Sequence, residues 1–335
     1  MYNYILASLL SDYEQKKRKA ELDFEYKKNL LYKKYPRLKE IEDELNSVAI
    51  SETKKILLGS TSSLKNLHEK LEELRKEKNT LIQENNIPKE FLQPSYECNL
   101  CKDTGYIKSG TSATVMCSCL KQKLIDISYN KSNISNLKKE NFQKFNENLF
   151  SENILENFQI SPRQNIINIK EKCIDFINNF DNLDTHNLLF IGNTGLGKTF
   201  MSNCIANELI KRGKTVFYQT SPVLLETIID NKFNRYKDIS KDNFYKNVLE
   251  SDLLIIDDLG TECLNSMKLS ELFTILNTRL LNLNNKSTKT IISTNLDIDN
   301  IFNNYEERIG SRIAGFYDIY YFFGDDLRIK QRSMC

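Results

Sequence analysis

The stretch Asn187-Leu-Leu-Phe-Ile-Gly-Asn-Thr-Gly-Leu-Gly-Lys-Thr199 decides the fold of this 335-residue chain. An apolar run over 187–191 predicts a buried β-strand, and a helix is expected from Phe200 to Lys211. Between them, Gly192 to Thr199 fits the pattern G-x-x-x-x-G-K-[ST]. Its glycines allow backbone N–H groups to turn inward on phosphate oxygens, and the helix start adds partial positive charge. The sequence therefore predicts a phosphate-binding loop, since a chance glycine-rich turn would not be flanked in this way.

Acidic and amide side chains follow two later strands. Leu253-Leu-Ile-Ile256 runs into Asp257-Asp258, 58 residues after Thr199. Asp257 would hold a Mg²⁺ ion together with the Thr199 hydroxyl, and Asp258 is the candidate general base for the attacking water. Asn295, at the end of the next strand, offers an amide to the γ-phosphate or the water. An ordinary acid pair and a turn-forming amide are the alternatives at these positions.

The expected ligand is a nucleoside triphosphate, with Lys198 on its β- and γ-phosphates. The residues predicted to bind it are Gly192, Asn193, Thr194, Gly195, Leu196, Gly197, Lys198, Thr199, Phe200 and Asp257.

Short apolar runs alternate with helical stretches from about residue 161 onward. The runs cover 187–191, 215–218, 253–256, 290–293 and 319–323. Continuous apolar strands of this kind are typical of a parallel sheet that helices cover on both faces. We therefore expect an α/β domain over 161–335.

Together these motifs resemble the AAA+ ATPases, and more narrowly the DnaC/DnaI-type replicative helicase loaders with their relative IstB. The resemblance extends over about 140–335. It rests on the phosphate loop, Leu254-Ile-Ile-Asp-Asp-Leu-Gly-Thr-Glu262, Ile291-Ile-Ser-Thr-Asn295, Glu307-Arg-Ile-Gly-Ser-Arg-Ile313, Gly324-Asp-Asp-Leu-Arg328 and Asn141-Phe-Gln-Lys-Phe-Asn-Glu-Asn-Leu-Phe150. It implies an AAA+ P-loop core with a five-stranded parallel sheet. Because only seven residues follow Arg328, we expect no sizeable helical lid.

The resemblance also implies roles for single residues. Asn295 matches the sensor 1 position, and Arg328 matches the sensor 2 arginine that acts on its own subunit's nucleotide. Arg312 matches the arginine finger that reaches a neighbouring subunit, with Arg308 as the competing choice. Salt-bridged helix positions are the alternative for these arginines. Many relatives carry Glu in place of Asp258, so we expect slower activation of water.

An inserted helical stretch lies between Thr220 and Asp252. Its place matches the family's initiator-specific motif, which implies contact with single-stranded DNA. The residues predicted to make it are Lys232, Phe233, Arg235, Tyr236 and Lys237. Aromatic stacking with phosphate contacts suits single strands. Residues 221–250 hold five basic and five acidic side chains, so an ordinary amphipathic helix is the alternative.

Four cysteines predict a zinc module over 96–122. Cys98-x-x-Cys101 and Cys117-x-Cys119 are separated by 15 residues, a spacing that suits tetrahedral Zn²⁺. Four protein ligands would make this site structural, with no open position for catalysis. Cys173, Cys204, Cys263 and Cys335 have no such partners in sequence, and His68 and His186 have no metal-like or triad-like neighbours.

Residues 1–95 are rich in Lys and Glu and predict helices. Leu64, Leu67, Leu71, Leu74 and Leu81 form an a/d seam, with Lys78 in the one missing place. An earlier stretch carries Leu31, Tyr35, Leu38, Ile41 and Leu45, and Gly59-Ser-Thr-Ser-Ser63 separates the two. We expect an antiparallel coiled-coil-like hairpin, which packs on itself, docks another protein, or does both.

Composition limits the classes of function. Lys and Arg number 47 against 45 Asp and Glu, so nucleic-acid binding needs a local patch. No apolar segment reaches the roughly 18–20 residues that span a bilayer. The apolar start Tyr4–Leu10 lacks the basic region of a signal peptide. We therefore expect a cytoplasmic protein whose cysteines are thiols or metal ligands.

These predictions combine into an ATP-dependent loader of a replicative helicase. Residues 1–95 and the zinc module would bind the hexameric helicase, 123–160 would be a linker, and 161–335 would bind ATP, Mg²⁺ and single-stranded DNA while self-associating. Two alternatives stay open: an IstB-like transposition helper ATPase, and a zinc-stabilised nucleic-acid-binding adaptor that binds ATP without turnover. The sequence names neither the helicase nor the oligomer size.

Overall fold

The computed structural model describes residues 2–57, 64–109, 113–128, 140–155, 158–233, 239–281 and 287–332. The chain divides into two compact units. One holds residues 7–115, and the other holds 116–335 together with the first six residues. The finer boundaries at 95, 122 and 160 stay predictions.

The first unit is dominated by three helices, α1 (Tyr2–Lys34), α2 (Pro36–Leu57) and α3 (Leu64–Glu84). The apolar positions from Leu31 to Leu45 do not lie on one helix, because the chain breaks at Tyr35. Pro36 explains the break, since proline lacks the N–H that a helix interior needs but suits a first turn.

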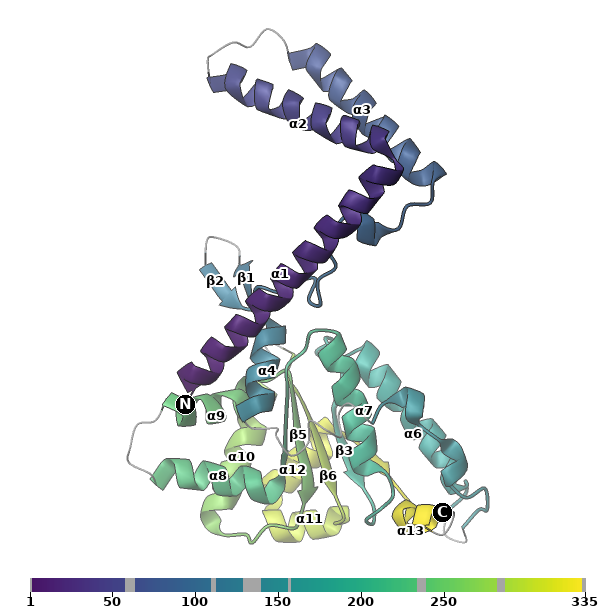
Figure 1. Cartoon of the computed structure of the whole chain (residues 1–335). Coiled ribbons are helices and arrows are strands. Elements are labelled where there is room, and N and C mark those ends of the chain that lie inside the picture. Colours follow the sequence, from purple (N-terminus) through teal and green to yellow (C-terminus); the bar gives the residue numbers. More distant parts are fainter. Residues whose placement is uncertain are drawn as a thin grey trace. The chain divides into compact units, whose positions relative to one another are not determined.

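Helices α2 and α3 form the expected antiparallel pair (Figure 1). Arg37, near the start of α2, donates two hydrogen bonds of 2.7 and 3.0 Å to Glu77, near the end of α3. Lys78, the polar residue in the predicted seam, donates to Glu42 at 2.7 Å. The separating segment Gly59–Ser63 and the side chains of Leu64 and Leu67 lie outside the described residues.

The second unit is built on a parallel sheet of five strands in the order β4-β5-β6-β3-β7. The strands are β3 (Asn187–Ile191), β4 (Val216–Thr220), β5 (Leu253–Leu259), β6 (Lys289–Thr294) and β7 (Tyr317–Tyr321). The last strand lies two residues earlier than the expected 319–323. Phe322 continues past the strand and packs in the core beside Phe190, so its apolar character reflects tertiary packing.

Helices cover both faces of this sheet (Figure 1). One face packs on α6 (Pro162–Asn178) and α7 (Lys198–Lys211). The other packs on α8 (Ser221–Phe233), α9 (Ile239–Glu250), α10 (Ser266–Leu281), α11 (Ile298–Tyr305) and α12 (Glu307–Phe316). On β3, Leu188 and Phe190 belong to one apolar cluster, whereas Leu189 and Ile191 belong to the other. This confirms the predicted five-stranded parallel sheet with helices on both faces.

Shorter elements border the sheet. Helix α4 (Ser118–Ser128) packs on the edge strand β4, where the Gln122 amide donates to Val216 O at 3.0 Å and accepts from Val216 N at 2.6 Å. A side chain thus pairs backbone groups that an edge strand leaves open. The other elements of the described residues are the 3₁₀ turns η1 (Lys89–Phe91), η2 (Phe142–Lys144) and η3 (Glu147–Leu149), the hairpin β1 (Tyr106–Ser109) and β2 (Ala113–Met116), and α13 (Leu327–Arg332). None of the described helices combines the length and apolarity that crossing a membrane requires.

Candidate functional site

The phosphate loop connects β3 to α7 at the carboxyl edge of the sheet. Gly195 has a φ of +75°, and a Cβ there would lie 2.0 Å from Oδ1 of Asp326. Gly192 is equally constrained, because its Cβ would lie 2.2 Å from the Phe322 carbonyl oxygen. Any larger residue would therefore collide with the segment that follows β7. The loop glycines are required by close packing as well as by the backbone conformation.

Lys198 lies at the first position of α7 and is buried. Its ammonium group donates to the carbonyl oxygen of Gly192, to that of Asn193 at 2.7 Å and to Oδ1 of Asn295 at 2.8 Å. Burial lowers the pKa of Lys198, although Asp258 and Asp257 oppose that effect. The structure thus brings the loop lysine and the amide at the end of β6 into direct contact.

Thr199 and Asp257 come together from α7 and β5. The Thr199 hydroxyl lies 3.0 Å from Oδ2 of Asp257, and the Asp257 side chain is almost fully buried. A hydroxyl and a carboxylate at this distance, beside a phosphate loop, are the oxygen ligands that Mg²⁺ prefers. The donor set therefore fits the predicted magnesium site.

Asp258 occupies a strained position next to Asp257. Its φ is +56°, in the left-handed region that non-glycine residues seldom adopt, and the register between β5 and β6 shifts between Ile256 and Leu259. This bulge turns Asp258 toward the cavity, where it is half-buried. Burial and the neighbouring Asp257 charge raise the pKa of Asp258. Backbone strain of this kind clusters at functional sites.

A cavity of about 400 Å³ lies over the phosphate loop. Besides 194–201 and Asp258, its lining includes Glu140, Lys144, Phe145, Asn146, Leu149, Phe150, Ile166, Leu327 and Arg328. The segment 140–150 was expected to belong to a linker, yet it forms part of the apolar wall through Phe145, Leu149 and Phe150, which lie in or directly after the turns η2 and η3. Sequence reasoning missed this role, although the similarity of Asn141–Phe150 to the family's pre-core segment was the available signal.

The predicted arginines occupy different places. Arg328 lines the cavity of its own chain, and its charge acts on Lys198 and Asp258. Arg312 is absent from that lining; its Nε donates to Oδ1 of Asn277 at 2.9 Å, and its guanidinium lies 4.4 Å from the centre of the Phe273 ring. The Arg308 guanidinium lies 4.5 Å from the centre of the same ring, and its Nε pairs with Glu306 at 2.7 Å.

The residues predicted to touch DNA are described only in part. Lys232, near the end of α8, donates to the buried carboxylate of Glu271 on α10. A DNA phosphate would have to compete with that carboxylate for the ammonium group. The side chain of Phe233 and all of Arg235, Tyr236 and Lys237 lie outside the described residues.

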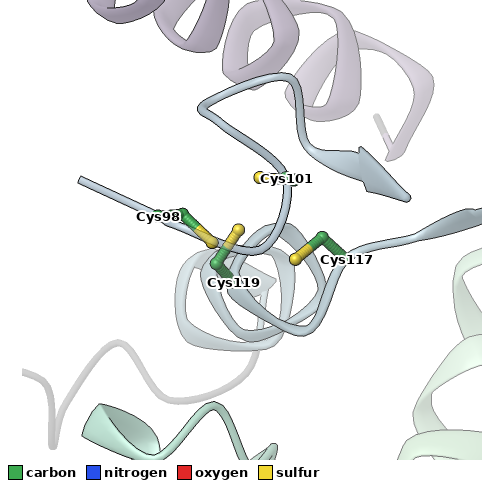
Figure 2. Close-up of side chains that lie close together, drawn as sticks. All are labelled: Cys98, Cys101, Cys117 and Cys119. Atoms are coloured by element: carbon green, nitrogen blue, oxygen red, sulfur yellow. The ribbon is translucent and has the colours of Figure 1, made fainter. Parts of the chain in front are cut away.

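Cys98, Cys101, Cys117 and Cys119 gather in one cluster (Figure 2). Their sulfur atoms all lie within 4.8 Å of one another. The backbone N–H of Gly105 points at Sγ of Cys101, 3.4 Å away, as it would toward a metal-bound thiolate. The Asp103 carboxylate accepts from the N–H groups of Glu97 and Cys98 at 2.9 Å, which fixes the loop. Four convergent sulfurs fit Zn²⁺ in a closed structural site.

The model of the IstB-like ATP binding protein family matches residues 134–309, slightly more than half of the chain. The chain belongs to this family. Membership agrees with the phosphate loop, the buried Lys198 and the paired Thr199 and Asp257, and it implies a site for ATP with Mg²⁺.

Curated relatives cover parts of the same region. The chromosomal replication initiator protein DnaA of Campylobacter jejuni is 32% identical over 130 residues, which are 38% of this chain and 28% of the relative. The replicative helicase loader DnaC of Buchnera aphidicola is 31% identical over 88 residues, 26% of this chain and 35% of that protein. DnaC of Escherichia coli is 27% identical over 107 residues, 32% of this chain and 42% of that protein. The chain thus spans less than half the length of each.

Solved structures resemble somewhat more than half of the chain. A crystal structure of the DnaC helicase loader superposes with a TM-score of 0.46 at 20% identity, covering 56% of this chain and 99% of the other. AMPPCP-bound DnaA from Aquifex aeolicus gives a TM-score of 0.41 at 22% identity, covering 56% and 55%.

Proposed function

We propose that this protein is an ATP-dependent loader that places a replicative DNA helicase on single-stranded DNA. The observation that carries the proposal is the convergence of Lys198, Thr199 and Asp257 beside one cavity, in a chain whose family is described as ATP-binding. The similarity to DnaC proteins, which are named helicase loaders, supports the choice of partner.

The residues of this site would have different roles in ATP hydrolysis. Lys198 would exchange its loop carbonyls for the β- and γ-phosphate oxygens, while Thr199 and Asp257 would hold Mg²⁺, which offsets phosphate charge. Asp258 would accept a proton from the water that attacks the γ-phosphorus as the bond to ADP breaks. Asn295 would orient that water or the γ-phosphate, and Arg328 would offset charge from the same subunit. Slow hydrolysis would suit a switch that times release of the helicase.

Loss of the loop lysine tests the enzymatic part. Lys198→Ala is expected to abolish ATP hydrolysis and weaken ATP binding, because no other described cation contacts both the loop and Asn295. Lys211→Ala is the matched control, since Lys211 ends the same helix and pairs with Glu208 on the surface. Equal activity in both variants would contradict the assignment of the site.

The helicase would bind the first unit, residues 7–115, which we call the helical unit. On α1, Leu22, Tyr26 and Leu30 recur every four residues, and their exposed fractions are 56%, 65% and 42%. Residues four apart lie on one side of a helix, so these side chains form an exposed apolar stripe. Such a stripe suits the apolar groove or helix face of a protein partner.

Co-purification with a hexameric replicative helicase in the presence of ATP tests this partner. We expect the full chain to retain the helicase and the double variant Leu22→Ser, Tyr26→Ser to lose it. Leu183→Ser is the control, because Leu183 is similarly exposed in the other unit. If a fragment lacking residues 1–125 retains the helicase as well as the full chain does, the helicase binds elsewhere.

The family also makes an IstB-like transposition helper a second candidate. Binding to a transposase in place of a helicase would favour it. The helical unit and the cysteine cluster favour the loader, since both lie outside the ATP-binding family match.

A further inference from the structure

The Asp257 carboxylate accepts hydrogen bonds from hydroxyl groups on three different elements. Thr199 on α7 was expected from the sequence, but Tyr218 on β4 and Ser293 on β6 were not. Tyr218 donates to Oδ2 of Asp257, and Ser293 donates to Oδ1. Strands β4 and β6 are the two neighbours of β5 in the sheet. Each neighbouring strand therefore supplies a donor to one oxygen of the carboxylate, and together they determine its plane.

The Asp257 carboxylate is buried, so it depends on the hydrogen bonds from Tyr218 and Ser293. Asp257, Tyr218 and Ser293 are all almost fully buried. A buried carboxylate without donors or counter-charges is costly, and hydrogen bonds to its ionised form stabilise it. Hydroxyl donors also carry no full charge. They can hold Asp257 as an anion without neutralising the charge that a cation needs.

Ser293 has a second contact. Its Oγ accepts from the backbone N–H of Asp258 at 3.1 Å while donating to Asp257. Asp258 has the positive φ described above, a strained conformation that persists only where the surrounding structure holds it. One hydroxyl therefore bridges the side chain of the first acid and the strained backbone of the second.

We propose that Tyr218 and Ser293 are positioning residues of the nucleotide site. Tyr218 orients Asp257 toward the cation, and Ser293 orients Asp257 and also fixes the bulge that presents Asp258 to the cavity. Neither residue lines the cavity, so both act through the acids. The proposal rests on the proposed ATPase function.

The two residues predict different kinetic effects. Tyr218→Phe removes one charge-assisted hydrogen bond to Asp257 and should raise the Mg²⁺ concentration for half-maximal hydrolysis about tenfold, with little change in kcat at saturating Mg²⁺. Ser293→Ala removes a bond to each acid, so it should raise the Mg²⁺ requirement and also lower kcat about tenfold. Ser293→Thr keeps the hydroxyl and should restore most of the activity.

The experiment uses the full chain. ATP hydrolysis is titrated with Mg²⁺, and binding of a fluorescent ATP analogue is measured with Mg²⁺ and with EDTA. The control for Tyr218 is Tyr317→Phe, which removes a buried hydroxyl on β7. Thermal unfolding of each variant reports any loss of packing. A variant that is merely less stable would shift the unfolding temperature and leave the Mg²⁺ dependence of binding unchanged.

The outcomes separate this inference from the function on which it rests. If the wild-type protein hydrolyses ATP and both Tyr218→Phe and Ser293→Ala keep its Mg²⁺ dependence and kcat, the positioning roles are wrong and the ATPase stands. If Ser293→Thr is as impaired as Ser293→Ala, the hydroxyl is not the active feature. If the wild-type protein binds no nucleotide, the proposed function fails and the positioning roles fail with it.

Discussion

The cysteine cluster and the nucleotide site assemble in opposite ways. All four cysteines lie within 98–119, so a short piece of chain can bring them together. The nucleotide site draws on residues from Glu140 to Arg328 and on three neighbouring strands. Local sites depend on loop conformation and on the metal they bind, whereas the nucleotide site depends on the register of a whole sheet. The difference predicts which perturbations damage each region.

Metal removal should cause the largest loss of stability, and only at the cysteine cluster. Structural zinc contributes apparent free energies of about 10–16 kcal/mol. Chelation, or Cys101→Ser, should therefore make the segment around 98–119 sensitive to proteases while ATP binding persists. Metal analysis and limited proteolysis measure this. Cys263→Ser is the control, since Cys263 is exposed and outside the cluster. Protein purified without zinc, and indifferent to chelators, would contradict the assignment.

An arginine finger should extend the nucleotide site to a second subunit. Arg312→Ala is expected to lower kcat by about 10³-fold or more, because a cation that offsets charge in the transition state is lost. Nucleotide affinity should change little, as Arg312 does not line its own cavity.

Mixing variants tests whether that arginine acts in trans. Arg312→Ala and Lys198→Ala proteins should recover part of the activity together, since each supplies the half of a shared site that the other lacks. Arg308→Ala is the matched comparison, as both arginines pack on Phe273. If Arg308→Ala shows the larger loss and Arg312→Ala shows none, Arg308 is the finger.

Shortening a buried side chain should have the next largest effect, and its effect on ATP binding should differ between the two units. Ile255 lies in the middle of β5 and is fully buried, so Ile255→Ala should lower the free energy of unfolding by about 2–5 kcal/mol. Because a shift in this strand displaces Asp257, ATP binding should weaken as well. Leu74→Ala in α3 should leave ATP binding intact, and calorimetry with a nucleotide-binding assay distinguishes the two. If Ile255→Ala and Leu74→Ala had equal effects on ATP binding, the position of β5 would not determine the geometry of the nucleotide site.

Acid should have the smallest effect, on the helical hairpin. Burial acts to raise the pKa of Glu42, but hydrogen bonds from Lys28, Lys78 and Tyr32 outweigh it and lower the pKa from 4.5 to about 2. A lowered carboxyl pKa stabilises the folded state above pH 4.5, and this contribution is lost as the pH falls toward 2. The loss should amount to about 1–2 kcal/mol.

Hydrogen exchange of α2 and α3 between pH 5 and pH 2 measures this change. Glu42→Gln should already lack the stabilisation at pH 5, so its α2 and α3 should show a smaller pH dependence than those of the wild type. An identical pH dependence in both proteins would show that Glu42 does not hold the hairpin.

Much of this molecule was predictable because its signals are local. The phosphate loop, the apolar strands and the acid pair each occupy a few consecutive residues, and Lys198, Thr199, Asp257 and Asn295 do converge in the structure. The helical break at Tyr35 and the early end of β7 were not foreseen. Pattern alone does not separate two helices that share a periodicity, nor apolar residues that continue past a strand into the core.

Local sequence patterns were enough to predict the kind of site and its principal ligands, since glycine, lysine and carboxylate spacing follows from phosphate and magnesium chemistry. Which residues without a motif support those ligands became visible only in the folded chain. Tyr218, Ser293 and the segment 140–150 reach the site through strand order and packing, which bring together residues far apart in the chain. No sequence motif marks this tyrosine on one strand and this serine on another. Their roles depend on which strands lie beside β5, and that is a property of the assembled sheet.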